Sequence, residues 1–248
     1  MHPGVVAQAS ATVDRLTKST FHLGVGTGEN MNEGPLGYNF PKYDERASRM
    51  REALSIIRRL LNGEKLDFEG EYYNTKGAKL YSPPLKEVPI WLAAGGPKSS
   101  HLAAEFADGL MISVKDPEDA YERVINPAQI KTDELGKSQL RVHTYRWTMF
   151  AQNDDDAWES LKSWRGLRAP NRLQEIDPQA LREQADALPK EEIMSKFSRA
   201  GTIDELVDIY SPLVDDFGSE IVTIQISSVD QEETIKLLGK ELLPRLKK

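Results

Sequence analysis

The sequence has no cysteine among its 248 residues, which excludes disulfides, cysteine nucleophiles and thiolate metal sites. It also has no apolar run long enough to cross a bilayer. Its basic residues are scattered, and the formal net charge is -7, so the chain lacks the cationic surface that nucleic acids and anionic membranes require. The first four residues show no features of a signal peptide. These absences predict a soluble, cytoplasmic globular protein without a nucleic-acid or membrane partner.

Two further patterns are missing. No glycine-rich dinucleotide fingerprint stands in the required strand-to-helix context with an acidic residue downstream. No His, Asp and Glu spacing is typical of a metal site either. We therefore expect neither NAD nor a metal ion.

What the sequence does contain is an alternation of strands and helices. A helix with apolar residues at positions 47, 50, 54, 57 and 61 opens after Pro41 and stops at Asn62-Gly63. A capping box, Thr202 with Glu205, opens a late helix, and Asp230 with Glu233 caps the last one. Apolar or β-branched strands are predicted at residues 21–25, 88–94, 109–114, 141–150 and 220–228. This pattern predicts an α/β fold with parallel strands.

The remaining segments interrupt the alternation. Residues 66–84 contain Gly70, Gly77 and a Pro-Pro pair, and predict an excursion with a hairpin. Residues 166–189 are polar and irregular, and two helices are predicted after them. The stretch 166–200 is interpreted as an irregular helical insertion into one partial-barrel domain that spans residues 1–248. A helix is predicted at residues 5–11 and another at 154–165.

Five strands, each followed by a helix, resemble part of a (β/α)8 barrel, the TIM barrel, which needs eight such units. The prediction is that only about the last five units are present, through an N-terminal truncation or a gene start placed at an internal methionine. The alternative is an open five-stranded sheet, whose two exposed edges could bind a partner chain without catalysis.

Two glycine-rich turns follow predicted strands at the carboxyl end, where barrel enzymes assemble their active sites. Thr27, Glu29 and Asn32 lie in or just behind the first turn, Gly24 to Glu33. The second turn, Ala94-Gly95-Gly96, carries almost no side chain, so a flat ring or a phosphate could approach its backbone. Each turn is also compatible with a tight strand-to-helix connection and nothing more.

These turns, together with Leu66-Asp67-Phe68-Glu69-Gly70-Glu71-Tyr72-Tyr73, resemble the bacterial luciferase-like superfamily. Within it the chain is most similar to glucose-6-phosphate dehydrogenases that use coenzyme F420. The resemblance implies a homodimeric barrel enzyme that binds this deazaflavin at its strand ends. It places at cofactor-contact positions Thr27, Gly28, Glu29, Asn32, Ala94, Gly95 and Gly96.

The resemblance also assigns roles in the reaction. Glu29 matches the glutamate that supplies or takes a proton at the cofactor, and the alternative is a helix-start glutamate that favours the dipole. Lys115, Arg172 and Lys196 are the candidates for binding the substrate phosphate, although Lys115 falls one position early and the other two exchange basic types. Solvated surface charges are the alternative for all three.

Other family residues are absent from the chain. A histidine of the glucose-6-phosphate enzymes falls at Leu173, and none of the four histidines, at positions 2, 22, 101 and 143, matches a catalytic position. The family's histidine base and tryptophan belong to N-terminal units that the chain does not contain, so it is expected to be incomplete as a catalyst. The prediction is an F420-dependent dehydrogenase of glucose 6-phosphate or a similar sugar phosphate. The alternatives are an F420-dependent alcohol dehydrogenase, an FMN-dependent monooxygenase and a non-catalytic fragment.

Overall fold

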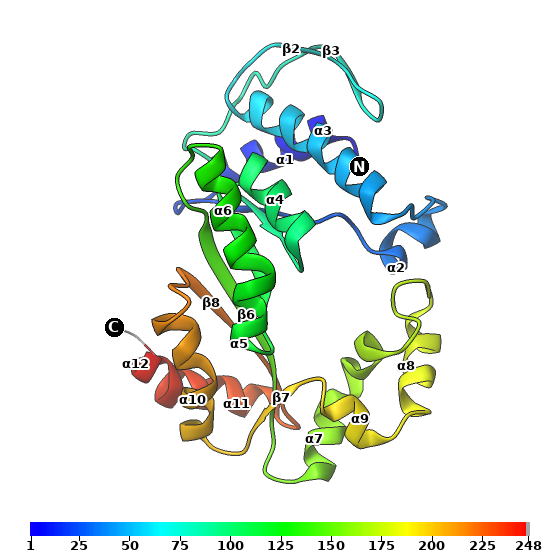
Figure 1. Cartoon of the computed structure of the whole chain (residues 1–248), viewed down its shortest axis with the longest axis vertical. Coiled ribbons are helices and arrows are strands. Elements are labelled where there is room, and N and C mark those ends of the chain that lie inside the picture. Colours follow the sequence, from blue (N-terminus) through cyan, green and yellow to red (C-terminus); the bar gives the residue numbers. More distant parts are fainter. Residues whose placement is uncertain (247–248) are drawn as a thin grey trace. The chain divides into compact units, whose positions relative to one another are not determined.

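The computed structural model describes residues 1–246 and consists of helices and mostly parallel strands (Figure 1). The helices are α1 Pro3–Leu16, α2 Asn30–Glu33, α3 Tyr43–Leu61, α4 Pro97–Phe106, α5 Pro117–Ala120, α6 Asn126–Glu134, α7 Asp154–Ser160, α8 Pro178–Asp186, α9 Lys190–Met194, α10 Ile203–Asp215, α11 Gln231–Leu237 and α12 Leu243–Leu246. The strands are β1 Leu23–Val25, β2 Leu66–Glu69, β3 Asn74–Ala78, β4 Ile90–Ala93, β5 Gly109–Ser113, β6 Arg141–Phe150, β7 Ser198–Ala200 and β8 Ile221–Ser227. No helix within these residues is both long and apolar enough to span a membrane.

The chain divides into two compact units. Unit 1 consists of Met1–Thr27, Pro41–Met111 and Arg123–Arg141, and unit 2 of the other three segments, Gly28–Phe40, Ile112–Glu122 and Val142–Lys248. The boundary passes through β5, which gives its first three residues to unit 1.

In unit 1, β1 pairs with β4 and β4 pairs with β5, both in parallel. Helix α3 packs against α1, and α4 against α6. Ala47, Leu54, Ile57 and Leu61 of α3 are buried, as their helical spacing predicts. Gly63, with a φ of 81°, follows the end of this helix. The predicted hairpin is present as the antiparallel pair β2 and β3.

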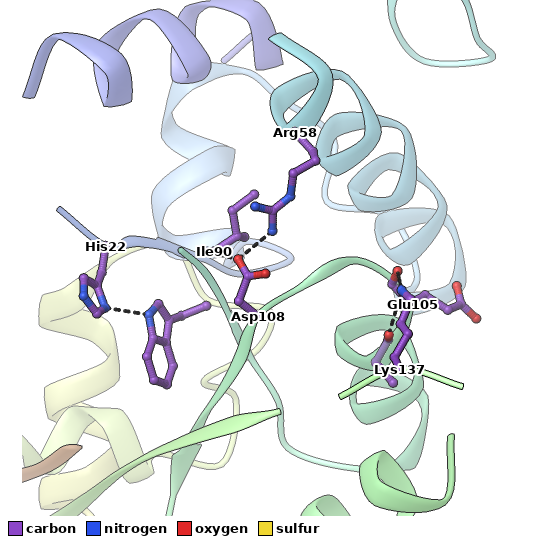
Figure 2. Close-up of polar contacts among 8 residues, drawn as sticks. His22, Arg58, Ile90, Glu105, Asp108 and Lys137 are labelled. Carbon is purple, nitrogen blue, oxygen red and sulfur yellow. Dashed lines mark hydrogen bonds and ion pairs between the residues drawn. The ribbon is translucent and has the colours of Figure 1, made fainter. Parts of the chain in front are cut away.

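A carboxylate joins the amino ends of β4 and β5 (Figure 2). Asp108 directly precedes β5, and its Oδ2 accepts the backbone N–H of Ile90 at 2.7 Å and Nη2 of Arg58 at 2.6 Å. Lys137 donates to the carbonyls of Ala104 and Glu105 near the end of α4. These contacts satisfy backbone groups that strand and helix ends would otherwise leave unpaired.

Trp91 of β4 is the largest fully buried side chain of unit 1 and is held on three sides. Its Nε1 donates to Nδ1 of His22 at 2.8 Å, and the two rings lie nearly parallel, with their centres 5.7 Å apart. Arg141 places its guanidinium 4.9 Å from the Trp91 ring centre. Gly109 is the register partner of Trp91, and its missing side chain makes room for the ring.

In unit 2, β6 pairs in parallel with both β7 and β8. Tyr210 of α10 packs on one face of β6, donates to the carbonyl of Arg146 at 3.0 Å and shares a 2.9 Å hydrogen bond with Thr148. Burial raises the pKa of the Tyr210 hydroxyl to about 12. The opposite face of β6 presents His143, Tyr145 and Trp147, which alternate with the buried residues of the first face.

The structure confirms the predicted α/β class and most of the expected elements, and it adds others, among them β7 and α8. β7 is a sixth parallel strand where five were predicted. Its three residues, Ser-Arg-Ala, have no β-branched member, so only pairing with Thr148 to Phe150 of β6 makes it a strand. The prediction that residues 166–189 are irregular is wrong in part, because α8 lies within them. Asp177 caps that helix by accepting the N–H of Gln179.

Candidate functional site

The candidate residues of unit 1 directly follow β1 and β4 in the chain. Arg46 of α3 donates Nη1 to the backbone carbonyl of Thr27 at 3.4 Å and to its hydroxyl at 3.3 Å. Ser99 of α4 accepts the N–H groups of Gly95 and Gly96 at 3.1 and 3.2 Å. No atom lies within 4 Å of the position that a Cβ would take on Gly95 or Gly96. The space in front of this backbone is therefore open to a flat ligand.

The candidate residues of unit 2 begin at Gly28. Its φ of 87° and the carboxylate of Glu33, which lies where a Cβ would be, make a side chain at this position unfavourable. Glu29 is the N-cap of α2, and its side chain makes no capping hydrogen bond. The Glu29 side chain is 53 % exposed. Asn32 is exposed on the same short helix.

A contact distant in sequence joins the proton-transfer candidate to a substrate candidate. Nη1 of Arg172 lies 3.5 Å from Oε1 of Glu29. The neighbouring Asn30 donates its amide to the carbonyl of Gln174 at 2.7 Å, which fixes α2 against the segment that carries Arg172. Both charged groups are partly exposed, so the pair contributes at most about 1 kcal/mol to stability and can separate easily.

The other two substrate candidates also lie in unit 2. Lys115 follows β5 and donates its Nζ to the carbonyl of Ser195 at 2.6 Å. Lys196 follows Ser195 in the chain. Its Nζ donates to the backbone carbonyl of Arg168 at 3.3 Å and lies 3.4 Å from Oε1 of Glu192. All three predicted phosphate-binding cations therefore belong to the same unit as Glu29.

Sequence reasoning missed one residue here. Tyr145 projects from the face of β6 that carries His143, and their rings meet edge to face at 6.3 Å. Burial raises the pKa of the Tyr145 hydroxyl, the negative charge of Glu29 raises it further, and Arg172 lowers it. Tyr145 is thus a neutral hydrogen-bond donor in the electrostatic neighbourhood of Glu29. The alternation of polar and aromatic residues along β6 was the available signal.

Three of the four histidines make structural contacts, and His101 is exposed on α4. His2 caps α1 by accepting the N–H of Gly4 at 3.1 Å, and His143 shares a 2.8 Å hydrogen bond with Thr223. His22 holds Trp91, as described above. Leu173, which follows Arg172 in the chain, is 61 % exposed. Within residues 1–246 no three His, Cys, Asp or Glu side chains gather closely enough to hold a metal ion.

A cavity of about 760 Å³ in unit 1 lies at the other end of the strands from Gly95 and Gly96. Its lining includes Glu87, which precedes β4, and Asp108, which precedes β5. Because parallel α/β enzymes place their chemistry at the carboxyl ends of strands, this cavity is not the candidate active site.

Parallel strands alternating with helices, with glycine turns and charged groups following the strands, define an enzyme-type α/β protein. The luciferase-like monooxygenase family matches residues 1–215, and the chain belongs to this family. It is 34 % identical over 252 residues to an F420-dependent glucose-6-phosphate dehydrogenase of Microbacterium testaceum (strain StLB037), covering 100 % of this chain and 75 % of that protein. The enzyme of the same name from Mycolicibacterium gilvum (strain PYR-GCK) is also 34 % identical, with the same coverage.

Among solved structures, an F420-dependent secondary alcohol dehydrogenase in complex with an F420-acetone adduct superimposes with a TM-score of 0.89. It is 26 % identical, and the match covers 99 % of this chain and 76 % of that one. These similarities confirm the resemblance to the luciferase-like barrel enzymes.

Proposed function

We propose that the chain is an F420-dependent dehydrogenase that oxidises a hydroxyl carbon, with glucose 6-phosphate or a similar sugar phosphate as substrate. The observation that carries the proposal is the contact between Glu29 and Arg172. It links the carboxylate that would handle a proton to a cation that would hold the substrate phosphate. Similarity to two enzymes named for this activity, which covers 100 % of this chain and 75 % of each of them, supports the cofactor and the reaction class.

When bound, F420 supplies a deazaflavin ring that accepts a hydride. A carboxylic acid held near such a ring would provide the proton that compensates the negative charge of the hydride. Glu29 is suited to this task because its carboxyl group is exposed and makes no cap hydrogen bond. Tyr145 would supply a neutral hydrogen-bond donor to the same end of the site.

The cofactor-contact residues would act within their own units. In unit 1, the open backbone of Gly95 and Gly96 fits a flat ring or a phosphate, and Arg46 fixes Thr27. In unit 2, Gly28 allows the turn that exposes Glu29. Ala94 and Asn32 complete the proposed set.

The substrate phosphate would be held by Lys115, Arg172 and Lys196. An arginine presents a planar fork and a lysine a point charge, so these groups can surround a tetrahedral dianion from different directions. Arg172 would then leave its weak contact with Glu29 for the stronger charge of the phosphate. A homodimer in the cytoplasm and a single barrel domain, with residues 166–200 inserted, remain part of the same proposal.

A second candidate is oxidation of a secondary alcohol that has no phosphate. Leu173 favours it, because an exposed apolar side chain stands where the glucose-6-phosphate enzymes have a histidine. The 0.89 TM-score with an F420-dependent secondary alcohol dehydrogenase agrees with this candidate.

The test is reduction of F420 by glucose 6-phosphate, followed as loss of cofactor absorbance. Glu29→Gln should keep F420 affinity within a few fold and lower the reduction rate by roughly 100-fold or more, since general acid catalysis contributes this much. Glu159→Gln, an exposed glutamate of α7 that pairs with Lys162, is the matched control and should react normally. Reduction by 2-propanol but not by glucose 6-phosphate would favour the second candidate, and equal rates for Glu29→Gln and the unaltered chain would contradict the role of Glu29.

A further inference from the structure

Arg168 is a cation without a counter-ion. Its side chain is half-buried, its Nε is out of contact with solvent, and its guanidinium makes no hydrogen bond or ion pair with any residue in the range 1–246. Burial lowers the pKa of the Arg168 guanidinium, and the positive charge of Arg172 lowers it further. A desolvated cation beside a like charge is unfavourable unless an anion compensates it.

The guanidinium is held in place by aromatic packing. It lies 5.0 Å from the ring centre of Phe197, which is itself buried. Phe197 stacks with Trp164, and Trp164 meets Trp147 of β6 edge to face at 4.7 Å. Stacking on a rigid ring orients the planar fork of an arginine and leaves its N–H groups free to donate. Arg168 is therefore fixed and unpaired at once.

The neighbours of Arg168 are the cations already proposed to bind phosphate. Lys196 donates to the Arg168 carbonyl, and Lys115 donates to the carbonyl of Ser195, one residue before Lys196. Arg172 is close enough for its positive charge to lower the pKa of Arg168. Glu192 and Glu29 contact Lys196 and Arg172 at 3.4 and 3.5 Å, and neither forms an ion pair with Arg168.

We propose that Arg168 is a fourth phosphate-binding residue of this site, and that its free guanidinium is the group that selects a phosphate monoester dianion over a neutral alcohol. This proposal rests on the proposed function, because that function supplies a substrate with a phosphate group. Arg168 is not among the residues to which the family resemblance assigns phosphate binding.

The matched control lies three residues earlier. Arg165 has the same aromatic packing, at 4.3 Å from the ring centre of Trp158, but it forms an ion pair with Asp186. Methionine at either position keeps an unbranched apolar side chain over the ring and removes the charge. Arg168→Lys is the second variant, because it keeps the charge and loses the fork.

Binding of inorganic phosphate to the full chain is measured by calorimetry, with chloride at equal ionic strength as reference, and Tm is measured with and without phosphate. The unaltered chain should bind phosphate and gain Tm from it. Arg168→Met should raise the Kd by roughly 10- to 100-fold, the usual effect of losing a hydrogen bond to a charged group. It should leave the phosphate-free Tm unchanged or higher, since it removes an uncompensated charge. The phosphate Kd of Arg168→Lys should lie between those of the unaltered chain and Arg168→Met. Arg165→Met should have a lower Tm and an unchanged phosphate Kd.

An unchanged Kd in Arg168→Met, together with a lower Tm, would show that Arg168 serves only to pack on Phe197, and would overturn the proposal. Absence of phosphate binding to the unaltered chain would overturn it as well. Reduction of F420 by glucose 6-phosphate separates the two proposals. If the chain reduces F420 and Arg168→Met keeps its KM, the anion role fails and the function stands. If Arg168→Met loses phosphate binding but the unaltered chain does not reduce F420, the anion role of Arg168 stands and the proposed function fails.

Discussion

Replacing Gly109 by alanine should destabilise unit 1 through a single methyl group. An added Cβ would lie 2.4 and 2.6 Å from two carbons of the Trp91 ring, closer than van der Waals contact allows. The ring cannot move away freely, because Trp91 is 2 % exposed, its Nε1 is bonded to His22 and Arg141 covers it. Overpacking of this kind costs about 1–3 kcal/mol. A tilt of the ring would weaken the His22 hydrogen bond by up to about 1 kcal/mol more.

A loss of about 2–3 kcal/mol lowers the Tm of a chain of this size by roughly 4–12 °C. Thermal unfolding followed by circular dichroism measures it. Gly239→Ala is the control, because this exposed glycine lies within a helical turn and no atom is within 4 Å of the added methyl. That substitution should leave Tm unchanged or raise it. An unaltered Tm in Gly109→Ala would refute the view that the glycine is required by Trp91.

Three further outcomes are expected. The pKa of the Tyr210 hydroxyl is about 12 in the folded chain and near 10 in the unfolded chain. The contribution of Tyr210 to stability should therefore be constant below about pH 10 and fall by about 2–3 kcal/mol as the pH rises from about 10 to 12. Tyr210→Phe should remove this part of the alkaline loss, at a cost of about 1–2 kcal/mol at neutral pH because Thr148 loses its partner, and urea unfolding at several pH values measures both. Thr202→Ala breaks the capping box with Glu205 and should lower the free energy of unfolding by about 1 kcal/mol in the same assay. Asp108→Ala should cost about 2–3 kcal/mol, since the N–H of Ile90 and the Arg58 guanidinium both lose an acceptor.

The sequence contains enough information to predict elements that local chemistry decides. Apolar spacing locates α3, and the side chains of Thr202 and Asp230 make the capping hydrogen bonds predicted for α10 and α11. β7 is different, because Ser-Arg-Ala has no strand preference and becomes a strand only by pairing with β6. Sequence reasoning also could not place α8, since the surrounding polar residues concealed the cap at Asp177.

The candidate site divides in the same way. Glu29 and the glycine turns follow strands, so their place at the carboxyl ends could be inferred from order along the chain. The contact of Glu29 with Arg172 joins residues 143 positions apart, and no local pattern encodes it. Tyr145 and Arg168 become visible only when burial and missing partners are known.

The most direct test of the account is whether the purified chain binds F420. Oxidised F420 is titrated into the protein while cofactor fluorescence is followed, and FMN is titrated in parallel. The account predicts saturable binding of F420, weakened when Gly95 and Gly96 are both changed to valine, and much weaker binding of FMN. Tight binding of FMN with no binding of F420 would contradict the central claim.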